Sequence, residues 1–173
     1  MEIEKSNYDI VEMVNEFKIR KGKFKDIPEV IEINMKTLPE HYSDDFYEDM
    51  VKNSPETFLV AENKDIVGYI ICRIEHGFSS FKKLKIVKKG HIVSVAIKEE
   101  HRRKGIGKAL INNAVQGMMM RNCAEAFLEV RISNVMAIDL YKVLGFEIKS
   151  RMERYYNDGE IAYSMSLNLE EPK

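Results

Sequence analysis

The fold of this chain is constrained most by a short basic segment with two glycines, which lies between an apolar strand and a helix. Residues His91–Ile97 form a nearly continuous apolar run, which predicts a buried strand. The basic segment 102–107 follows, then a helix predicted from about Gly105 to Arg121, and then a second strand over Phe127–Ile132. Because a strand, a helix and a strand in this order make a right-handed crossover, we expect the two strands to be a parallel pair.

The remaining segments add strands and helices to this pair. A hairpin is predicted where Asn63-Lys64-Asp65 separates the strands Thr57–Ala61 and Ile66–Ile74. Apolar and polar residues alternate from Tyr163 to Leu169, which predicts a last strand. Further helices are predicted over residues 27–38, 43–51 and 134–144. The expected fold is therefore α/β, with a mixed, mostly antiparallel sheet, a central parallel pair and helices on both faces.

Two segments stand apart from this pattern. The apolar residues between Ile10 and Phe17 have helical spacing, so residues 1–16 are predicted to be a helical extension. Residues 17–169 then form one domain, as a length of 173 residues favours. Residues 76–90 are predicted to be a long connection that contains no acidic residue. Its lysines are Lys82, Lys83, Lys85, Lys88 and Lys89.

The composition excludes several classes of protein. Lys and Arg total 27 and Asp and Glu total 28, so a chain-wide basic surface for nucleic acid is not expected. Two cysteines, Cys72 and Cys123, cannot form a disulfide framework or a four-ligand zinc site, and we expect buried thiols and no metal. No apolar run approaches the roughly 18 residues that a membrane helix needs, and the acidic N-terminus lacks a signal sequence. We expect a cytoplasmic protein that does not bind membranes.

The segment Arg102-Arg103-Lys104-Gly105-Ile106-Gly107 is typical of a phosphate-binding loop. Glycines let the backbone approach a ligand closely, and the N-terminus of the following helix carries a positive partial charge. Lys108 adds a further full charge. The spacing fits neither the GxxxxGK[ST] loop nor the GxGxxG loop, because position 110 is Leu and no Ser or Thr follows a Lys. A solvated basic turn that only caps the helix is the other interpretation.

Together with the preceding SVAI and the following KALI, this segment resembles the acetyl-coenzyme-A-binding motif of the GNAT acetyltransferases, (Gln/Arg)-x-x-Gly-x-(Gly/Ala). A later stretch, SNVMAIDLYKVLGF, is similar to the N-x-x-A-x-x-x-Y-x-x-x-G-F stretch of the same family. The resemblance covers about residues 17–169 and implies the GNAT (acyl-CoA N-acyltransferase) fold with acetyl-CoA as co-substrate. The coenzyme-binding residues that it implies are Val93, Val95, Ile97, Arg102, Arg103, Lys104, Gly105, Ile106, Gly107, Lys108, Asn134, Ala137 and Tyr141.

Four further stretches resemble one branch of the family, the catalytic subunit of N-terminal acetyltransferase complex A and its archaeal relatives. They are LPEHY at 38–42, GHIVS at 90–94, LEVRISN at 128–134 and YYNDGEIAY at 155–163. His41 stands where the family usually has Asn. The resemblance implies transfer of an acetyl group to the α-amine of protein N-termini. It also implies a peptide-binding wall on each side, formed by Leu38, Pro39, Glu40 and Tyr42 and by Tyr155 and Tyr156.

The chemistry needs a neutral amine, a base and a proton donor for the departing thiolate. An α-amine has a pKa of roughly 7.7–8.0, so only a modest base is required. The candidates are Glu129, which strand parity sets apart from the apolar Leu128 and Val130, together with His91 and Glu40. The resemblance makes Tyr141 the proton donor, and the sequence leaves open which of the three candidates is the base.

Other functions remain open at this stage. The same fold could acetylate lysine or a small amine. A different class, a non-catalytic acyl-CoA-binding or ribosome-docking module, would use the lysines between Lys82 and Lys89 to approach ribosomal RNA, with strong salt dependence. The expected partners are protein or peptide N-termini, with closeness to the ribosome through that basic loop and without specific nucleic-acid binding.

Overall fold

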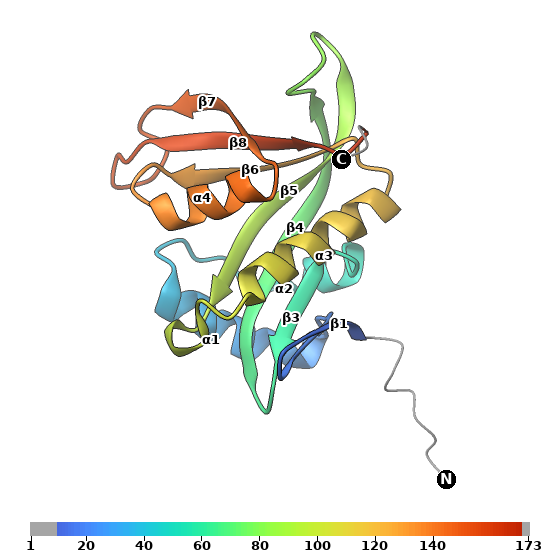
Figure 1. Ribbon diagram of the computed structural model, residues 1–173, viewed down its shortest axis with the longest axis vertical. Helices are drawn as coiled ribbons and strands as arrows, with labels where there is room; N and C mark the ends of the chain where they lie inside the picture. Colours follow the sequence, from blue (N-terminus) through green and yellow to red (C-terminus); the bar gives the residue numbers. More distant parts are fainter. Residues whose placement is uncertain (1–9, 171–173) are drawn as a thin grey trace. The chain divides into compact units, whose positions relative to one another are not determined.

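The computed structural model describes residues 10–170 (Figure 1). Within them, eight strands are hydrogen-bonded in the order β1-β2-β3-β4-β5-β6-β8-β7. The β5–β6 pair is parallel, and the pairs β1–β2, β2–β3, β3–β4, β6–β8 and β7–β8 are antiparallel. The predicted mixed sheet with one parallel pair is confirmed. The chain divides into two compact units, one of residues up to 73 with 93–117 and one of residues 74–92 with 118 onward.

The first unit contains the N-terminal strands and most of the helices. Its strands are β1 (Ile10–Val14), β2 (Phe17–Lys21), β3 (Phe58–Glu62) and the first part of β4 (Ile66–Phe78), and β5 (Ile86–Ile97) enters it at Val93. Its helices are α1 (Ile27–Thr37), α2 (Asp44–Asn53) and α3 (Ile106–Met120), the last up to Gly117, with short 3-10 turns at Phe24–Asp26 and Glu99–His101. Figure 1 shows α3 in front of these strands and α1 and α2 behind them, so helices cover both faces.

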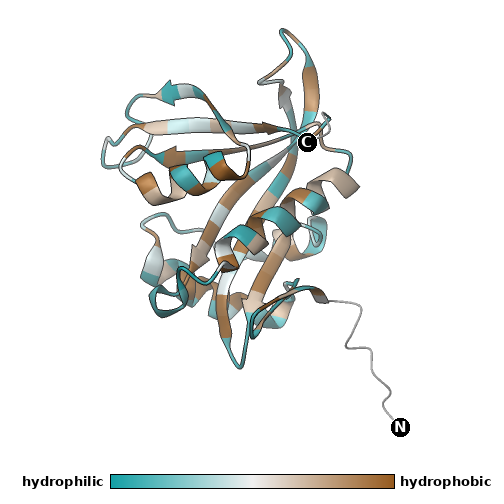
Figure 2. Ribbon diagram, viewed as in Figure 1, coloured by the Kyte–Doolittle hydropathy of each residue, from teal (hydrophilic) through white to brown (hydrophobic). Residues whose placement is uncertain are grey.

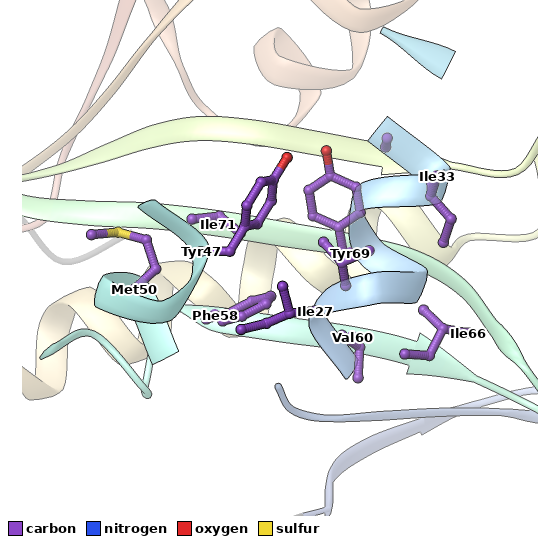
Figure 3. Packing of buried hydrophobic residues seen from close by; sticks show 11 residues of the cluster. Ile27, Ile33, Tyr47, Met50, Phe58, Val60, Ile66, Tyr69 and Ile71 are labelled. Atoms are coloured by element: carbon purple, nitrogen blue, oxygen red, sulfur yellow. The ribbon is translucent and has the colours of Figure 1, made fainter. Parts of the chain in front are cut away.

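A compact apolar core lies between the strands and the helices α1 and α2. Its members come from α1 (Ile27, Val30, Ile33), α2 (Tyr47, Met50), β3 (Phe58, Val60), β4 (Ile66, Tyr69, Ile71) and β5 (Ala96). Figure 3 shows most of these side chains packed together, and β3 is hydrophobic along most of its length in Figure 2. Burial of this apolar surface holds the α1–α2 connection in place, because both helices depend on the same core.

Helix α3 packs so closely that only glycine fits near its end. A Cβ atom built on Gly117 would lie 2.2 Å from the carbonyl oxygen of Glu56, just before β3. The other end of α3 follows the basic segment that the sequence singles out. The helix is therefore fixed against the start of β3 at the end opposite the candidate phosphate-binding loop.

The second unit contains the C-terminal strands and helix α4. Its elements are the end of β4 and the start of β5, then β6 (Glu125–Arg131), α4 (Val135–Val143), β7 (Glu147–Met152) and β8 (Ala162–Asn168). The parallel register sets Lys89 opposite Glu125 and His91 opposite Phe127. Gly145, with φ of 94°, follows the C-cap residue Leu144 and ends α4.

The structure corrects two predictions about the chain's ends and connections. Ile10–Val14 is a strand that pairs with β2 across a tight turn, so the predicted helix of residues 1–16 is wrong in its described part. Residues 1–9 lie outside the described residues. The basic connection 76–90 is also shorter than predicted, because β4 runs to Phe78 and β5 begins at Ile86. The strand β7 was missed, since most of its residues are exposed and carry no period-two pattern.

Candidate functional site

The basic segment forms an exposed turn that leads into α3. Arg103 and Gly105 both have positive φ, of 64° and 81°, and the helix begins at Ile106. The first helical hydrogen bond runs from the N–H of Ala109 to the carbonyl of Gly105, at 3.1 Å. The N–H groups of residues 106–108 therefore have no partner within the helix and are available to an anion. This geometry fits the diphosphate of a coenzyme.

The charged side chains of the segment have different surroundings. Arg102 is exposed, and its Nε–H donates to the carbonyl of Ile97 at 3.1 Å, which ties the turn to the end of β5. The ammonium group of Lys104 lies 5.6 Å from the ring centre of Phe17. Arg103 and Lys108 are exposed. The segment thus offers a field of positive charge around the helix N-terminus.

Strand β5 presents the predicted coenzyme-pairing residues on one face. Val93, Val95 and Ile97 are half-buried, whereas Ser94 and Ala96 between them are buried. The alternation places these three side chains on one face of the strand. The hydroxyl of Tyr42 donates to the carbonyl of Val93 at 3.3 Å, so the α1–α2 connection is held against this strand.

The α1–α2 connection, residues 38–42, is the predicted first wall of the peptide site. Leu38 and Tyr42 pack against the core, and Tyr42 stacks on Phe46 with ring centres 4.6 Å apart. Pro39 is exposed and Glu40 is half-buried. The N–H of Leu38 donates to the carbonyl of Asn34 at 3.0 Å, which ends α1. The connection is therefore a fixed surface, anchored at both ends.

In the second unit, the structure brings together two of the predicted catalytic residues. The Nε2 atom of His91 lies 2.6 Å from Oε2 of Glu129, and both side chains are 15% exposed. The imidazole stacks on Phe127 with ring centres 4.3 Å apart and planes 8° from parallel. Among the described residues, Nδ1 of His91 is buried and has no hydrogen-bond partner, and Oε2 of Glu75 lies 3.9 Å away.

This pair has a defined chemical capacity. A carboxylate only accepts hydrogen bonds, so Nε2 of His91 donates to Glu129. In the neutral imidazole the lone pair is then on Nδ1, the atom that has no partner. Nδ1 is thus the ring atom at which a proton could be accepted. Glu75 was missed from the sequence, because its partner is 16 residues away on the next strand.

The predicted coenzyme residues of α4 have structural roles that the contacts make clear. Asn134 is the N-cap of α4, and its side-chain oxygen accepts from the N–H of Ala137 at 3.3 Å. Tyr141 is 6% exposed, and its ring meets Phe146 edge-on with centres 5.8 Å apart. These contacts fix the position of each side chain.

Tyr155 and Tyr156 lie in the connection between β7 and β8. Their rings meet edge-on, with centres 5.0 Å apart. The guanidinium of Arg131 stacks on Tyr156 at 3.9 Å and makes ion pairs with Asp158 at 2.8 Å and Glu160 at 2.7 Å. Arg131 thus links Tyr156 to the two acidic residues of the same connection.

The two cysteines are buried free thiols, as predicted. Burial raises the pKa of the Cys123 thiol, which disfavours the nucleophilic thiolate. Within residues 10–170, no group of three or more His, Cys, Asp or Glu side chains is placed to hold a metal ion. None of the helices in that part of the chain is long and apolar enough to cross a membrane.

Comparison with known proteins defines the class. The model of the "Acetyltransferase (GNAT) family" matches residues 27–146, so the chain belongs to the GNAT acetyltransferases. Its fold and its enzyme class are thereby fixed, and the predicted GNAT fold is confirmed.

The relatives narrow the assignment within the family. An N-alpha-acetyltransferase of Sulfurisphaera tokodaii is 45% identical over 157 residues, covering 89% of this chain and 94% of the relative. The crystal structure of Ard1 from Thermoplasma volcanium matches with a TM-score of 0.75 and 30% identity, over 88% of this chain and 97% of that one. Naa20 of Chaetomium thermophilum, in complex with a bisubstrate analogue, matches with a TM-score of 0.77 and 27% identity over 88% and 86%. The chain is thus an enzyme whose similar relatives are N-alpha-acetyltransferases.

Proposed function

We propose that this enzyme transfers the acetyl group of acetyl-CoA to the free α-amine of protein N-termini, by direct attack in a ternary complex. The observation that carries the proposal is the His91–Glu129 pair, 2.6 Å apart, with the lone pair of the imidazole left on the unpartnered Nδ1. A base of this kind suits an α-amine, whose pKa of roughly 7.7–8.0 already leaves a part of it neutral near pH 7. It would be a weaker match for lysine, with a pKa of about 10.4.

Each proposed residue has one task. His91, oriented by Glu129, takes the proton that the attacking amine loses, directly or through water. A backbone N–H of β5 near Val93 or Val95 donates to the carbonyl oxygen of the thioester as negative charge develops there. Tyr141 donates a proton to the sulfur as the carbon–sulfur bond breaks. Glu40, half-buried within the α1–α2 connection (residues 38–42, the acceptor loop), binds the peptide.

The coenzyme is assigned to residues that fit its chemistry. The unpaired N–H groups of Ile106, Gly107 and Lys108 and the positive φ of Gly105 suit a diphosphate. The charges of Arg102, Arg103, Lys104 and Lys108 favour its negative charge. The half-buried face of Val93, Val95 and Ile97 would pair with the pantetheine arm, and Asn134 and Ala137 begin the helix that carries Tyr141.

The acceptor peptide is assigned to two surfaces. Leu38, Pro39, Glu40 and Tyr42 form one, and Tyr155 and Tyr156 form the other. This part of the proposal is supported by the names of the relatives, which are N-alpha-acetyltransferases from archaea and eukaryotes. A cytoplasmic location belongs to the same proposal, and so does closeness to the ribosome through the exposed Lys82, Lys83 and Lys85 of the Lys82–Lys89 stretch, where nascent N-termini would be at hand.

Two peptides and acetyl-CoA test the reaction. One peptide has a free N-terminal Ser and an internal Lys, and its twin has a blocked N-terminus. We expect fragment-ion mass spectrometry to place acetyl on the free α-amine only and to leave the twin unmodified. Acetyl on lysine in both peptides would contradict the proposal and favour a lysine acetyltransferase.

A variant identifies the base in the same assay. His91→Gln keeps a side-chain N–H that can donate to Glu129 but offers no basic nitrogen. We expect it to lower kcat by about 10²-fold or more while coenzyme binding is retained. A kcat close to that of the wild type would exclude His91 as the base and leave Glu129 or Glu40 for that task.

A further inference from the structure

A chain of hydrogen bonds in the first unit leads from the exposed His41 of the acceptor loop through three buried side chains to strand β5. Nδ1 of His41 lies 3.0 Å from Oδ1 of Asn34, and Nδ2 of Asn34 donates to the hydroxyl of Tyr69 at 3.0 Å. The Tyr69 hydroxyl lies 2.7 Å from Oγ of Ser94. Asn34, Tyr69 and Ser94 are 1%, 0% and 5% exposed. Three side chains that bond to one another are thus buried at or beside the apolar core.

The orientation of the Asn34 amide decides the direction of the first bond. Its nitrogen donates to Tyr69, so its oxygen faces His41 and must accept. His41 therefore donates through Nδ1–H, whether the ring is neutral or charged. Nδ1 is bonded to Cγ, as the amide nitrogen of asparagine is. His41 and an asparagine at this position would present a donor at nearly the same place.

We propose that the His41–Asn34–Tyr69–Ser94 chain positions the acceptor loop 38–42 against β5 and thereby sets the enzyme's affinity for the peptide. The inference rests on the proposed function, because it assigns the loop to the peptide. Asn34 holds the loop twice, through its carbonyl to the N–H of Leu38 and through its side chain to His41. The third attachment is the Tyr42 hydroxyl on the carbonyl of Val93, next to Ser94. Loss of the Tyr69 hydroxyl would leave Asn34 and Ser94 without their partner and release the loop.

The same core contains a natural control. Tyr47 belongs to the same apolar cluster as Tyr69 and is also 0% exposed. Figure 3 shows the two rings side by side with their hydroxyls pointing the same way. Among the described residues, the Tyr47 hydroxyl has no hydrogen-bond partner. The substitution of Tyr by Phe is therefore identical in size and burial at the two positions and differs in the hydrogen bonds lost.

Steady-state kinetics of Tyr69→Phe and Tyr47→Phe provide the first test. We expect Tyr69→Phe to raise the KM for peptide about tenfold, as loss of buried hydrogen bonds would, and to leave the KM for acetyl-CoA within about twofold. Tyr47→Phe should change neither value. A general loss of core packing would act on both variants alike, and equal peptide KM values in the two would overturn the proposal.

A His41 series tests the donor itself. His41→Asn should keep the KM for peptide within about twofold of the wild-type value, because the asparagine amide nitrogen replaces Nδ1 as the donor. His41→Leu should raise the peptide KM about as much as Tyr69→Phe, and the double variant should be no worse than either single one. If the increases in peptide KM of the two single variants multiply in the double variant, the two residues act separately and the proposed chain is refuted.

Hydrogen exchange separates this proposal from the proposed function. The amides of Leu38 and of residues 40–42 should exchange several-fold faster in Tyr69→Phe and His41→Leu than in the wild type or in Tyr47→Phe, with no substrate present. Unchanged exchange would refute the positioning role even if the wild type acetylates peptides. If the loop amides exchange faster in the two variants but the wild type acetylates no N-terminus, the hydrogen-bond chain does anchor the loop, and the proposed effect on peptide affinity is refuted.

Discussion

Two glutamates at opposite ends of β6 show how one strand can carry two different kinds of carboxylate. Glu125 and Glu129 are four residues apart and thus on the same face. The Glu125 side chain is 3% exposed and is bound by the hydroxyl of Ser79, the N–H of Ser80 at 2.9 Å and the ammonium of Lys89 at 3.4 Å. The Glu129 side chain is 15% exposed and has His91 as its partner at 2.6 Å.

The difference lies in what is left unpaired. The donors of Ser79, Ser80 and Lys89 all bond to the carboxylate of Glu125, as expected for a buried charge with a structural role. Beside Glu129 the partner itself retains a buried, unpaired nitrogen, which is costly for stability and useful for proton transfer. Phe127 lies between the two, with His91 stacked on its ring and the ammonium of Lys89 4.6 Å from its centre. We therefore expect the two ends of the strand to respond in opposite ways to the same substitution.

The largest effect is expected for Glu129→Gln. Glutamine can still accept from Nε2–H of His91 but carries no negative charge beside it, so kcat should fall by about 10²–10⁴-fold while the free energy of unfolding changes by less than about 1 kcal/mol. Initial rates with an N-terminal Ser peptide, together with urea unfolding, measure both quantities. Retention of most of the activity would remove Glu129 from the proposed mechanism.

Glu125→Gln should lower the free energy of unfolding and leave kcat nearly unchanged. Removal of one partner from a buried ion pair leaves Lys89 uncompensated, and the protein should lose about 3–5 kcal/mol of stability. The kcat of the folded fraction should stay within about twofold, since Lys89 and Glu125 have no part in the proposed chemistry. If kcat fell as far as in Glu129→Gln, the distinction between the two carboxylates would be lost.

Acid should reveal the same contrast. Burial alone would raise the pKa of Glu125, but the hydrogen bonds of Ser79 and Ser80 and the charge of Lys89 outweigh it and hold the pKa below its usual 4.5. A carboxylate with a lowered pKa in the folded state stabilises above the unfolded pKa and loses this contribution as the pH falls through the folded pKa. The stability gap between the wild type and Glu125→Gln should be full at pH 6 and should shrink below about pH 4.5. Urea unfolding at several pH values would detect it, and a constant gap would contradict the assignment.

The smallest effect is expected for Phe127→Leu. Leucine keeps an apolar side chain but removes the flat surface on which the imidazole of His91 rests. We expect kcat to fall only about three- to tenfold, because the bond to Glu129 still orients the ring. An effect as large as that of Glu129→Gln would mean that stacking, rather than the carboxylate, sets the position of His91.

Sequence patterns predicted the parts of the molecule that depend on local order. The parallel pair, the β3–β4 hairpin and the turn before α3 follow from apolar periodicity, turn residues and glycine spacing. Strand parity also placed Glu129 apart from the apolar face of β6. What parity could not give was its partner, because His91 and Glu129 are 38 residues apart and meet only through the register of β5 and β6.

The errors have a common physical origin. Residues from Ile10 to Val14 have helical spacing, but pairing with β2 satisfies their backbone groups and overrides a weak local preference. Lys88 and Lys89 were assigned to a loop by their charge, whereas Lys89 is 7% exposed within β5 and paired with Glu125. The network of Asn34, Tyr69 and Ser94 has no sequence signature, since its members are 25 or more residues apart.

The close contact of Gly117 has a consequence for acetyl-CoA. Helix α3 is a rigid rod whose first turn carries the N–H groups assigned to the diphosphate, and its position is set where Gly117 meets the carbonyl of Glu56. An added methyl group at Gly117 would force the helix away from the start of β3. We therefore expect the binding constant for acetyl-CoA to depend on Gly117, about three helical turns from the N–H groups assigned to the diphosphate, and natural variation at this site to be confined to glycine.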